Sequence, residues 1–534
     1  DGSVQPYGLL IPETYAFTGA QRHRLDFWFH GRHEVLTEGL FLMLRTRSQD
    51  QIEAYAPRDT LVLYPYARYC NASKFAGEVD SLEALAETQR RYRIDDERIS
   101  VRGFSMGGAA TWHFAVHYAD RWFAANPGAG FSETPRFLDF FQGEKLNPTV
   151  WEKKLWALYD CDKWALNLTQ CPTVAYSGEI DRQKQAADVM AEALTAHGID
   201  MVHIVAPKTA HKVVLPEAKD VEARMEALSR GGRRRVPSSI AFETYTLKYN
   251  RMNWVTVDGM AEHWARAEVR ASISGSSLVT AKTRHVTALT FAMDAGDCPL
   301  DLAAPVTLSI DGQELTNVPR PKSDRSWRVA LHRDGEAWKV GARPAAGLRK
   351  RHNLQGPIDD ALLDAFIFVR PTGAALNEIA GKWSESELKR AIEHWRLHFR
   401  GYAIVKDDTA ITEEDIASKN LILWGDPSSN AVLKKWADKL PIRWDSKTVT
   451  VGAKTFDAAH HAPILIYPNP LNPSRYVVLN SSFTFREFAY LNNARQVPML
   501  PDWAVVDLRE PPGTIYPGKI AEAGFFDEQW RLQD

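Results

Sequence analysis

The chain has 534 residues, of which 45% are hydrophobic and 25% are charged, and its formal net charge is −2. This length exceeds what one hydrophobic core supports, so we expect roughly two to four domains. The balanced charge provides no basic face for nucleic acid, no apolar stretch approaches the length of a membrane span, and four cysteines are too few for a disulfide framework.

The first 235 residues alternate short apolar segments with amphipathic ones. This alternation is typical of a mainly parallel sheet with helices on both faces, so an α/β domain is predicted for residues 1–235. Predicted strands are 25–29, 61–64, 99–102, 122–126, 173–176 and 201–205, and predicted helices are 81–92, 109–118, 185–197 and 217–230.

Residues 236–345 show a different pattern, with strand-like segments of period two and the hairpin-turn pairs Asp311-Gly312 and Asp334-Gly335. They predict a small, immunoglobulin-like β-sandwich. Residues 346–534 return to alternation and predict a second α/β domain, whose role the sequence does not indicate. The chain contains no phosphate-binding loop and no zinc-ligand spacing, so we expect no cofactor and no metal.

A Gly-x-Ser-x-Gly motif occupies residues 103–107, directly after a predicted strand and before a predicted helix. This is the context of a nucleophile elbow, in which a sharp turn exposes the serine hydroxyl. Ser105 is therefore the candidate nucleophile. The Met106 N–H at the start of the helix is suited to stabilise a developing oxyanion.

A serine needs a base, and the base needs an acid to orient it. In this fold class the acid follows a later strand and the base follows the next, in the order Ser, Asp, His. Asp181 lies past the turn after strand 173–176 and is preferred over Glu179. His211 lies in the loop after the last strand, whereas His203 lies within a strand and is interpreted as a packed structural residue.

The second oxyanion donor is expected at the end of strand 25–29, where Gly31 allows close approach and Arg32 supplies the N–H. Ligands of open α/β sheets bind outside the carboxyl ends of the strands. Loop residues at those ends are therefore candidates for the substrate pocket, although each is equally well explained as a structural loop contact. These candidates are His33, Arg68, Asn71, Lys74, Phe131 and Glu133.

With these residues in hand, the N-terminal 235 residues resemble an α/β-hydrolase, and more narrowly the prolyl-oligopeptidase-like serine hydrolases and related secreted bacterial esterases. The stretches that carry the resemblance are FAGEVD at 75–80, YRID at 92–95, RI at 98–99 and GFSMGG at 103–108. The resemblance implies that Ser105, Asp181 and His211 form the catalytic triad. It does not cover residues 236–534.

The chain departs from the peptidases of this family. No propeller repeat is visible, and the glutamate pair that grips a substrate amino terminus has no recognisable counterpart. These departures favour a feruloyl-, acetylxylan- or polyester-type esterase. A prolyl-oligopeptidase-like peptidase and a polysaccharide-binding scaffold with minor hydrolase activity are the alternatives.

The expected substrate is a small-molecule or polysaccharide ester, with neither nucleic acid nor a membrane as partner. The resemblance to secreted esterases implies a bacterial protein exported to the periplasm or the medium. Residues after 235 are expected to modulate polymer access or stability, so that a chain truncated near Arg235 keeps some activity on small esters if it folds.

Overall fold

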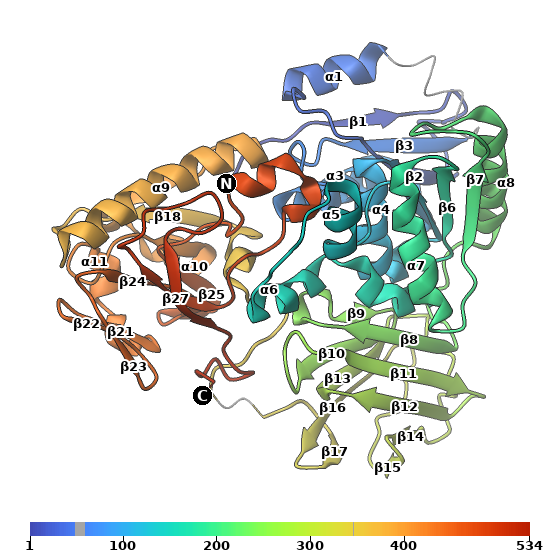
Figure 1. The fold of residues 1–534 in the computed structure, drawn as a ribbon. Helices are drawn as coiled ribbons and strands as arrows, with labels where there is room; N and C mark the ends of the chain where they lie inside the picture. Colours follow the sequence, from blue (N-terminus) through green and yellow to red (C-terminus); the bar gives the residue numbers. More distant parts are fainter. Residues whose placement is uncertain (48–58, 345–346, 534) are drawn as a thin grey trace.

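The computed structural model describes residues 1–47, 59–344 and 347–533. Figure 1 shows three regions in chain order: an N-terminal α/β region in blue to green, two β-sheets beside it in yellow-green, and a C-terminal region in orange to red. The N-terminus lies next to the C-terminal region, near helix α9.

The N-terminal region is built on a seven-stranded sheet with the order β1-β3-β2-β4-β5-β6-β7. All neighbouring strands are parallel except the edge pair β1 and β3, so the predicted, mainly parallel sheet is confirmed. The strands are β1 (Tyr7–Leu10), β2 (His23–Phe29), β3 (Thr60–Pro65), β4 (Ile94–Phe104), β5 (Ala124–Gly128), β6 (Val174–Gly178) and β7 (Val202–Ala206). The helices are α1 (Glu38–Arg47), α3 (Ala76–Arg91), α4 (Met106–His117), α5 (Pro135–Gln142), α6 (Val150–Leu155), α7 (Gln185–Thr195) and α8 (Leu215–Gly231).

Alternation along the central strands separates the two faces of this sheet. In β2, Leu25 and Phe27 enter the large hydrophobic core that includes α3 and α4. Asp26 faces the other side, where its carboxylate lies 3.0 Å from the Arg102 guanidinium, which is itself 2.7 Å from Glu222 of α8. Buried charges persist because they are paired in this way.

Some sequence-based boundaries differ from the structure. Helix α3 begins at Ala76, five residues before the predicted start, and β4 begins at Ile94 rather than 99. The edge strand β1 was not predicted. Its four residues are all only half-buried, and so short an edge strand lacks the hydrophobic run that marks a central strand.

The middle region consists of two five-stranded sheets with orders β17-β16-β13-β10-β9 and β15-β14-β12-β11-β8. Both predicted hairpin turns are present, between β14 and β15 and between β16 and β17. Asp311 and Gly312 have φ of 51° and 84°, as a two-residue hairpin turn with positive φ requires. The strands are β8 (Ser239–Thr244), β9 (Arg251–Met252), β10 (Val255–Met260), β11 (Ala267–Ser274), β12 (Leu278–Arg284), β13 (Val286–Met293), β14 (Thr307–Ile310), β15 (Gln313–Leu315), β16 (Trp327–Asp334) and β17 (Ala337–Val340).

The C-terminal region has a second seven-stranded sheet, with order β19-β18-β20-β25-β24-β26-β27, and a small antiparallel sheet, β21-β22-β23, that was not predicted. Helix α9 (Glu378–Phe399) runs along the upper side of the C-terminal region in Figure 1. Helix α11 is short and spans Ala431–Lys434. The remaining elements are β18 (Phe366–Arg370), β19 (Val405–Asp407), α10 (Glu413–Ser418), β20 (Asn420–Leu423), β21 (Ile442–Trp444), β22 (Thr448–Val451), β23 (Lys454–Asp457), β24 (His461–Asn469), β25 (Asn472–Leu479), β26 (Trp503–Asp507) and β27 (Lys519–Gly524).

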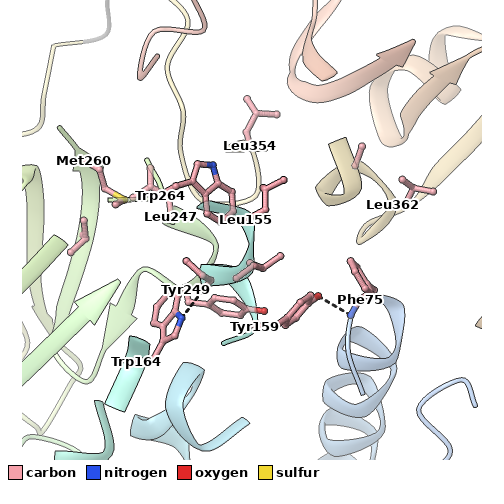
Figure 2. Packing of buried hydrophobic residues seen from close by; sticks show 14 of the residues in the cluster. Phe75, Leu155, Tyr159, Trp164, Leu247, Tyr249, Met260, Trp264, Leu354 and Leu362 are labelled. Atoms are coloured by element: carbon pink, nitrogen blue, oxygen red, sulfur yellow. Dashed lines mark hydrogen bonds between the residues drawn. The ribbon is translucent and has the colours of Figure 1, made fainter. Parts of the chain in front are cut away.

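One hydrophobic cluster runs through all three regions. Figure 2 shows Phe75 at the start of α3 beside Tyr159, whose hydroxyl accepts the Phe75 N–H at 3.0 Å. Trp164 and Tyr249 continue the cluster toward the middle region, with ring centroids 5.7 Å apart, and Leu362 belongs to its C-terminal part. A cut after Arg235 would expose this shared core to water, so truncation is expected to destabilise the N-terminal region.

Two smaller observations concern cysteines and helices. Cys70, Cys161, Cys171 and Cys298 are free and buried, so Cys161 and Cys171 do not pair in this structure. In the part of the chain that the structure describes, every helix is too short or too polar to cross a bilayer.

Candidate active site

Ser105 stands at the turn between β4 and α4. Its backbone has φ 62° and ψ −124°, an unfavourable conformation for a residue with a side chain. The Ser105 N–H donates to the Gly128 carbonyl at the end of β5, at 2.8 Å, which ties the turn to the neighbouring strand. The strained turn places this serine at the carboxyl edge of the sheet, as the motif predicted.

The glycines around Ser105 are required by close backbone contacts. A Cβ on Gly103 would lie 2.5 Å from the Gly107 carbonyl oxygen, and one on Gly107 only 2.0 Å from the Phe29 carbonyl oxygen. A Cβ on Gly108 would meet the Gly128 carbonyl oxygen at 2.2 Å. These distances are too short for any side chain, so the motif allows helix α4 to start directly against the ends of β2 and β5.

Asp181 and His211 come together from the loops after β6 and β7. The Asp181 Oδ2 lies 2.7 Å from His211 Nδ1, and its Oδ1 accepts the Gln183 N–H at 2.8 Å. The Asp181 side chain is 2% exposed and that of His211 is 39% exposed. A buried carboxylate is therefore bound to Nδ1 of a partly exposed imidazole, which is how a carboxylate orients a general base.

The imidazole also packs against the residue before the serine. The His211 and Phe104 rings have centroids 4.7 Å apart. Among the described residues, the Ser105 hydroxyl and His211 Nε2 form no hydrogen bond with each other. Such catalytic hydrogen bonds are often long in structures without substrate and tighten when it binds.

The two alternative residues have other partners. Glu179 Oε2 accepts the Lys208 N–H at 2.6 Å. The His203 Nε2 lies 2.7 Å from the Ser177 hydroxyl, and burial lowers the pKa of this histidine. These contacts join Glu179 and His203 to residues other than Asp181 and His211.

The loop at the end of β2 approaches the serine closely. A Cβ on Gly31 would lie 3.8 Å from Ser105 Cβ. The His30 ring nitrogens face the carbonyls of Gly31 at 2.8 Å and Tyr66 at 3.1 Å, and burial lowers the His30 pKa. Among the described residues, none accepts a hydrogen bond from the backbone N–H of Arg32. Met106 is the first residue of α4, and the first N–H groups of a helix have no partner within the helix. The role of both N–H groups as oxyanion donors stays a prediction.

Three of the pocket candidates are buried and occupied by structural contacts. The Arg68 guanidinium lies 2.9 Å from the Asp1 carboxylate. The Asn71 amide donates to the Ala67 carbonyl at 2.9 Å. Glu133 accepts two N–H groups in the first turn of α5, at 2.7 and 2.9 Å, and burial raises its pKa. These contacts favour the structural interpretation of all three.

The other three candidates differ in burial, and of these only Lys74 is buried. His33 is exposed, and Phe131 packs against the cluster that contains Met106. The Lys74 ammonium lies 5.0 Å from the Phe131 ring centroid, and burial lowers the Lys74 pKa to about 8. Contact of these residues with substrate stays a prediction.

Sequence reasoning missed one contributor to this site, a segment of the C-terminal region spanning residues 487–496, hereafter the 490 segment. The Lys74 ammonium donates to the Asn493 and Gln496 carbonyls at 3.2 and 3.3 Å, and the Thr134 hydroxyl donates to the Ala494 carbonyl at 3.2 Å. No local motif marks this segment, because its only signal is contact with loops some 400 residues earlier.

The sequence model of the prolyl oligopeptidase family matches residues 75–227, which include Ser105, Asp181 and His211. This match confirms the resemblance to the prolyl-oligopeptidase-like serine hydrolases and the α/β-hydrolase fold of this region. The protein therefore contains a serine hydrolase domain. No curated protein matches the chain.

Similarities to solved structures are weak. A thermostable esterase is 18% identical, with 43% of this chain and 59% of that chain covered and a TM-score of 0.31. A putative dipeptidyl aminopeptidase IV from Bacteroides ovatus is 14% identical, with 42% and 33% covered and a TM-score of 0.33. An acylaminoacyl peptidase from Pyrococcus horikoshii is 16% identical, with 43% and 40% covered and a TM-score of 0.33. The matched part spans less than two thirds of each of these chains, and TM-scores this low support no statement about function.

Proposed function

We propose that the protein is a serine carboxylester hydrolase that acts through an acyl-enzyme. The observation that carries the proposal is the Asp181–His211 hydrogen bond of 2.7 Å at the sheet edge that presents Ser105. The preferred substrates are carbohydrate-linked esters or other esters of small or aromatic acids.

The reaction follows from the placement of these groups. His211 Nε2 removes the Ser105 proton as the hydroxyl attacks the ester carbonyl carbon, and Asp181 holds the imidazole proton on Nδ1 and stabilises the imidazolium. The N–H groups of Met106 and Arg32 receive the oxyanion. His211 then protonates the departing alcohol. In the second half, it activates water to release the acid and regenerate Ser105.

The preference for esters over peptides rests on leaving-group chemistry. An alcohol leaves more easily than an amine, which must be protonated and held in position. Among the described residues, the accessory sheets are two five-stranded sheets, one seven-stranded sheet and one three-stranded sheet. None of the site residues supplies a glutamate pair for a substrate amino terminus. A triad without such a clamp is better suited to esters.

Peptide hydrolysis is the second candidate, since the matching family model is that of the prolyl oligopeptidases. One panel separates the two: p-nitrophenyl esters of increasing acyl length, feruloyl and acetylated sugars, and aminoacyl-prolyl amides, each with the Ser105→Ala variant as control. The proposal expects the best kcat/KM on an ester and little cleavage of the prolyl amides. A prolyl amide with kcat/KM equal to that of the best ester would overturn it.

A further inference from the structure

The side chain of Arg32 connects the oxyanion loop (residues 30–33) to the C-terminal region. Its Nη1 donates to the Leu491 carbonyl at 3.1 Å and its Nη2 to the Tyr490 carbonyl at 3.4 Å. Its Nε donates to Glu34 at 3.0 Å. The residue expected to give the second oxyanion N–H is thus attached by its guanidinium to main-chain atoms of the 490 segment.

A second connection runs through Cys70. The His33 N–H donates to the Cys70 Sγ at 3.3 Å, and the buried Asn493 amide donates to the Cys70 carbonyl at 2.8 Å. Cys70 also belongs to the same small hydrophobic cluster as Met106, the other expected oxyanion donor. The 490 segment therefore contacts the surroundings of both donors.

The loop that carries Cys70 is strained. Six of its non-glycine residues have positive φ: Ala67, Arg68, Tyr69, Ala72, Ser73 and Phe75. Such conformations persist only where the surrounding structure holds them. Here the holding contacts include the C-terminal region, through Asn493 on the Cys70 carbonyl and through the Lys74 ammonium on the 490 segment.

Helix α9 in turn contacts the 490 segment through two histidine side chains. The Tyr490 hydroxyl is hydrogen-bonded to His394 Nδ1 at 2.6 Å, and the His398 ring lies over the Tyr490 ring with centroids 3.9 Å apart. Burial lowers the pKa of both histidines, that of His398 to about 3, so both rings are neutral near pH 7. Two neutral histidine rings of α9 thus contact the side chain of Tyr490, the residue whose carbonyl Arg32 binds.

We propose that the C-terminal region is a positioning element of the active site: the 490 segment, through the Arg32 side chain and Cys70, holds the oxyanion loop where the Arg32 N–H meets the developing charge. This inference rests on the proposed function, since it assigns that N–H to an ester oxyanion. Arg32 then acts twice, as a main-chain donor and as a positioning side chain. A chain truncated near Arg235 lacks the 490 segment, so its kcat on a small ester should fall at least as far as that of an Arg32 variant even if it folded.

The test compares Arg32→Met and Arg32→Lys with two matched controls. Glu34→Gln removes the negative charge of the other partner of the guanidinium and leaves the carbonyl contacts intact. Arg396→Gln removes the 3.2 Å pair with Glu38, which joins the same two regions away from the oxyanion loop. The readouts are kcat and KM on a small ester, the ratio of kcat/KM between that ester and its thionoester, and labelling of Ser105 by a fluorophosphonate.

Loss of a whole oxyanion donor costs about 10²–10³ in kcat, so misplacement of one is expected to cost about 10-fold. Arg32→Met should show this fall with little change in KM, and Arg32→Lys should recover part of it because an ammonium still donates to carbonyls. Sulfur accepts hydrogen bonds poorly, so the preference for the oxygen ester should shrink in Arg32→Met. Both controls should match the wild type.

An unchanged ester-to-thionoester ratio in a folded Arg32→Met protein would overturn the inference, as would equal losses in Arg396→Gln. If Arg32→Met does not fold, Asn493→Ala tests the same claim through Cys70 and must show the same reduced ratio. Failure of the proposed function looks different, because the wild type itself would then leave Ser105 unlabelled or would cleave prolyl amides as well as it cleaves the small ester.

Discussion

The Asp181→Asn substitution tests the acid through the tautomer of His211. In the wild type, Oδ1 accepts the Gln183 N–H at 2.8 Å while Oδ2 faces His211 Nδ1 at 2.7 Å. An amide in this place keeps its oxygen on the Gln183 N–H, because an NH₂ group cannot accept that bond. The NH₂ then faces Nδ1 and donates to it. The imidazole proton moves to Nε2, which can no longer accept the proton of Ser105.

The size of the effect separates this mechanism from the mere loss of a contact. Loss of one hydrogen bond costs about 1 kcal/mol, or roughly 5-fold in rate. The wrong tautomer is expected to lower kcat by about 10⁴, or about 5.4 kcal/mol. Asp181→Ala imposes no tautomer, so it should retain more activity than Asp181→Asn.

The assay is kcat on a p-nitrophenyl ester, with Glu179→Gln as the matched control. The Glu179 carboxylate accepts the Lys208 N–H instead of facing His211, so its loss should change kcat by no more than a few-fold. A loss of 10-fold or less in Asp181→Asn, or a larger loss in Glu179→Gln, would refute the reasoning.

Three further substitutions extend the test. His211→Ala should abolish turnover with an unchanged Tm, whereas His203→Ala, which removes a 2.7 Å contact with a buried hydroxyl, should lower Tm and leave kcat within a few-fold; the reverse pattern would exchange their roles. Gly107→Ala places a Cβ 2.0 Å from a carbonyl oxygen and should destabilise by about 3 kcal/mol or more, so a wild-type Tm would contradict the packing. Burial raises the pKa of Asp160 to about 7 from an unfolded value near 3.9. The stability that protonation of Asp160 contributes to the folded state is therefore fully present below about pH 4 and is lost as the pH rises through 7. Asp160→Asn should therefore gain Tm relative to the wild type between about pH 5 and about pH 8, and a constant difference would argue against the raised pKa.

The elbow and the acid–base pair could be predicted because their signals are local. Gly103, Ser105 and Gly107 lie within one turn, and the structure shows backbone oxygens at 2.5 Å or less from any Cβ at either glycine. Asp181 and His211 were predicted from chain order, since carboxyl ends of parallel strands share one edge of the sheet. Periodicity also predicted the seven-stranded sheet, apart from its half-buried edge strand β1 (Tyr7–Leu10).

The rest of the site depends on contacts that no local pattern encodes. Arg68 and Lys74 follow a strand end, so the sequence placed them at the correct edge of the sheet. It could not show that the charge of Arg68 is paired with Asp1 or that Lys74 donates to a carbonyl of the 490 segment. The strained conformations of residues 67–75 were equally hidden, because ordinary residues rather than glycines adopt them. The small sheet β21–β23 was missed because strands of three or four residues give too short a pattern.

The central claim is that Ser105 is the nucleophile of an acyl-transfer reaction. The most direct measurement is mass spectrometry of the protein after treatment with a fluorophosphonate, with the modified peptide located by digestion. We expect one phosphonyl adduct, on Ser105 at the turn with φ 62°, none in Ser105→Ala, and a kcat for that variant lower by roughly 10⁴–10⁶. Undiminished labelling of Ser105→Ala, or an adduct on a different residue, would contradict the claim.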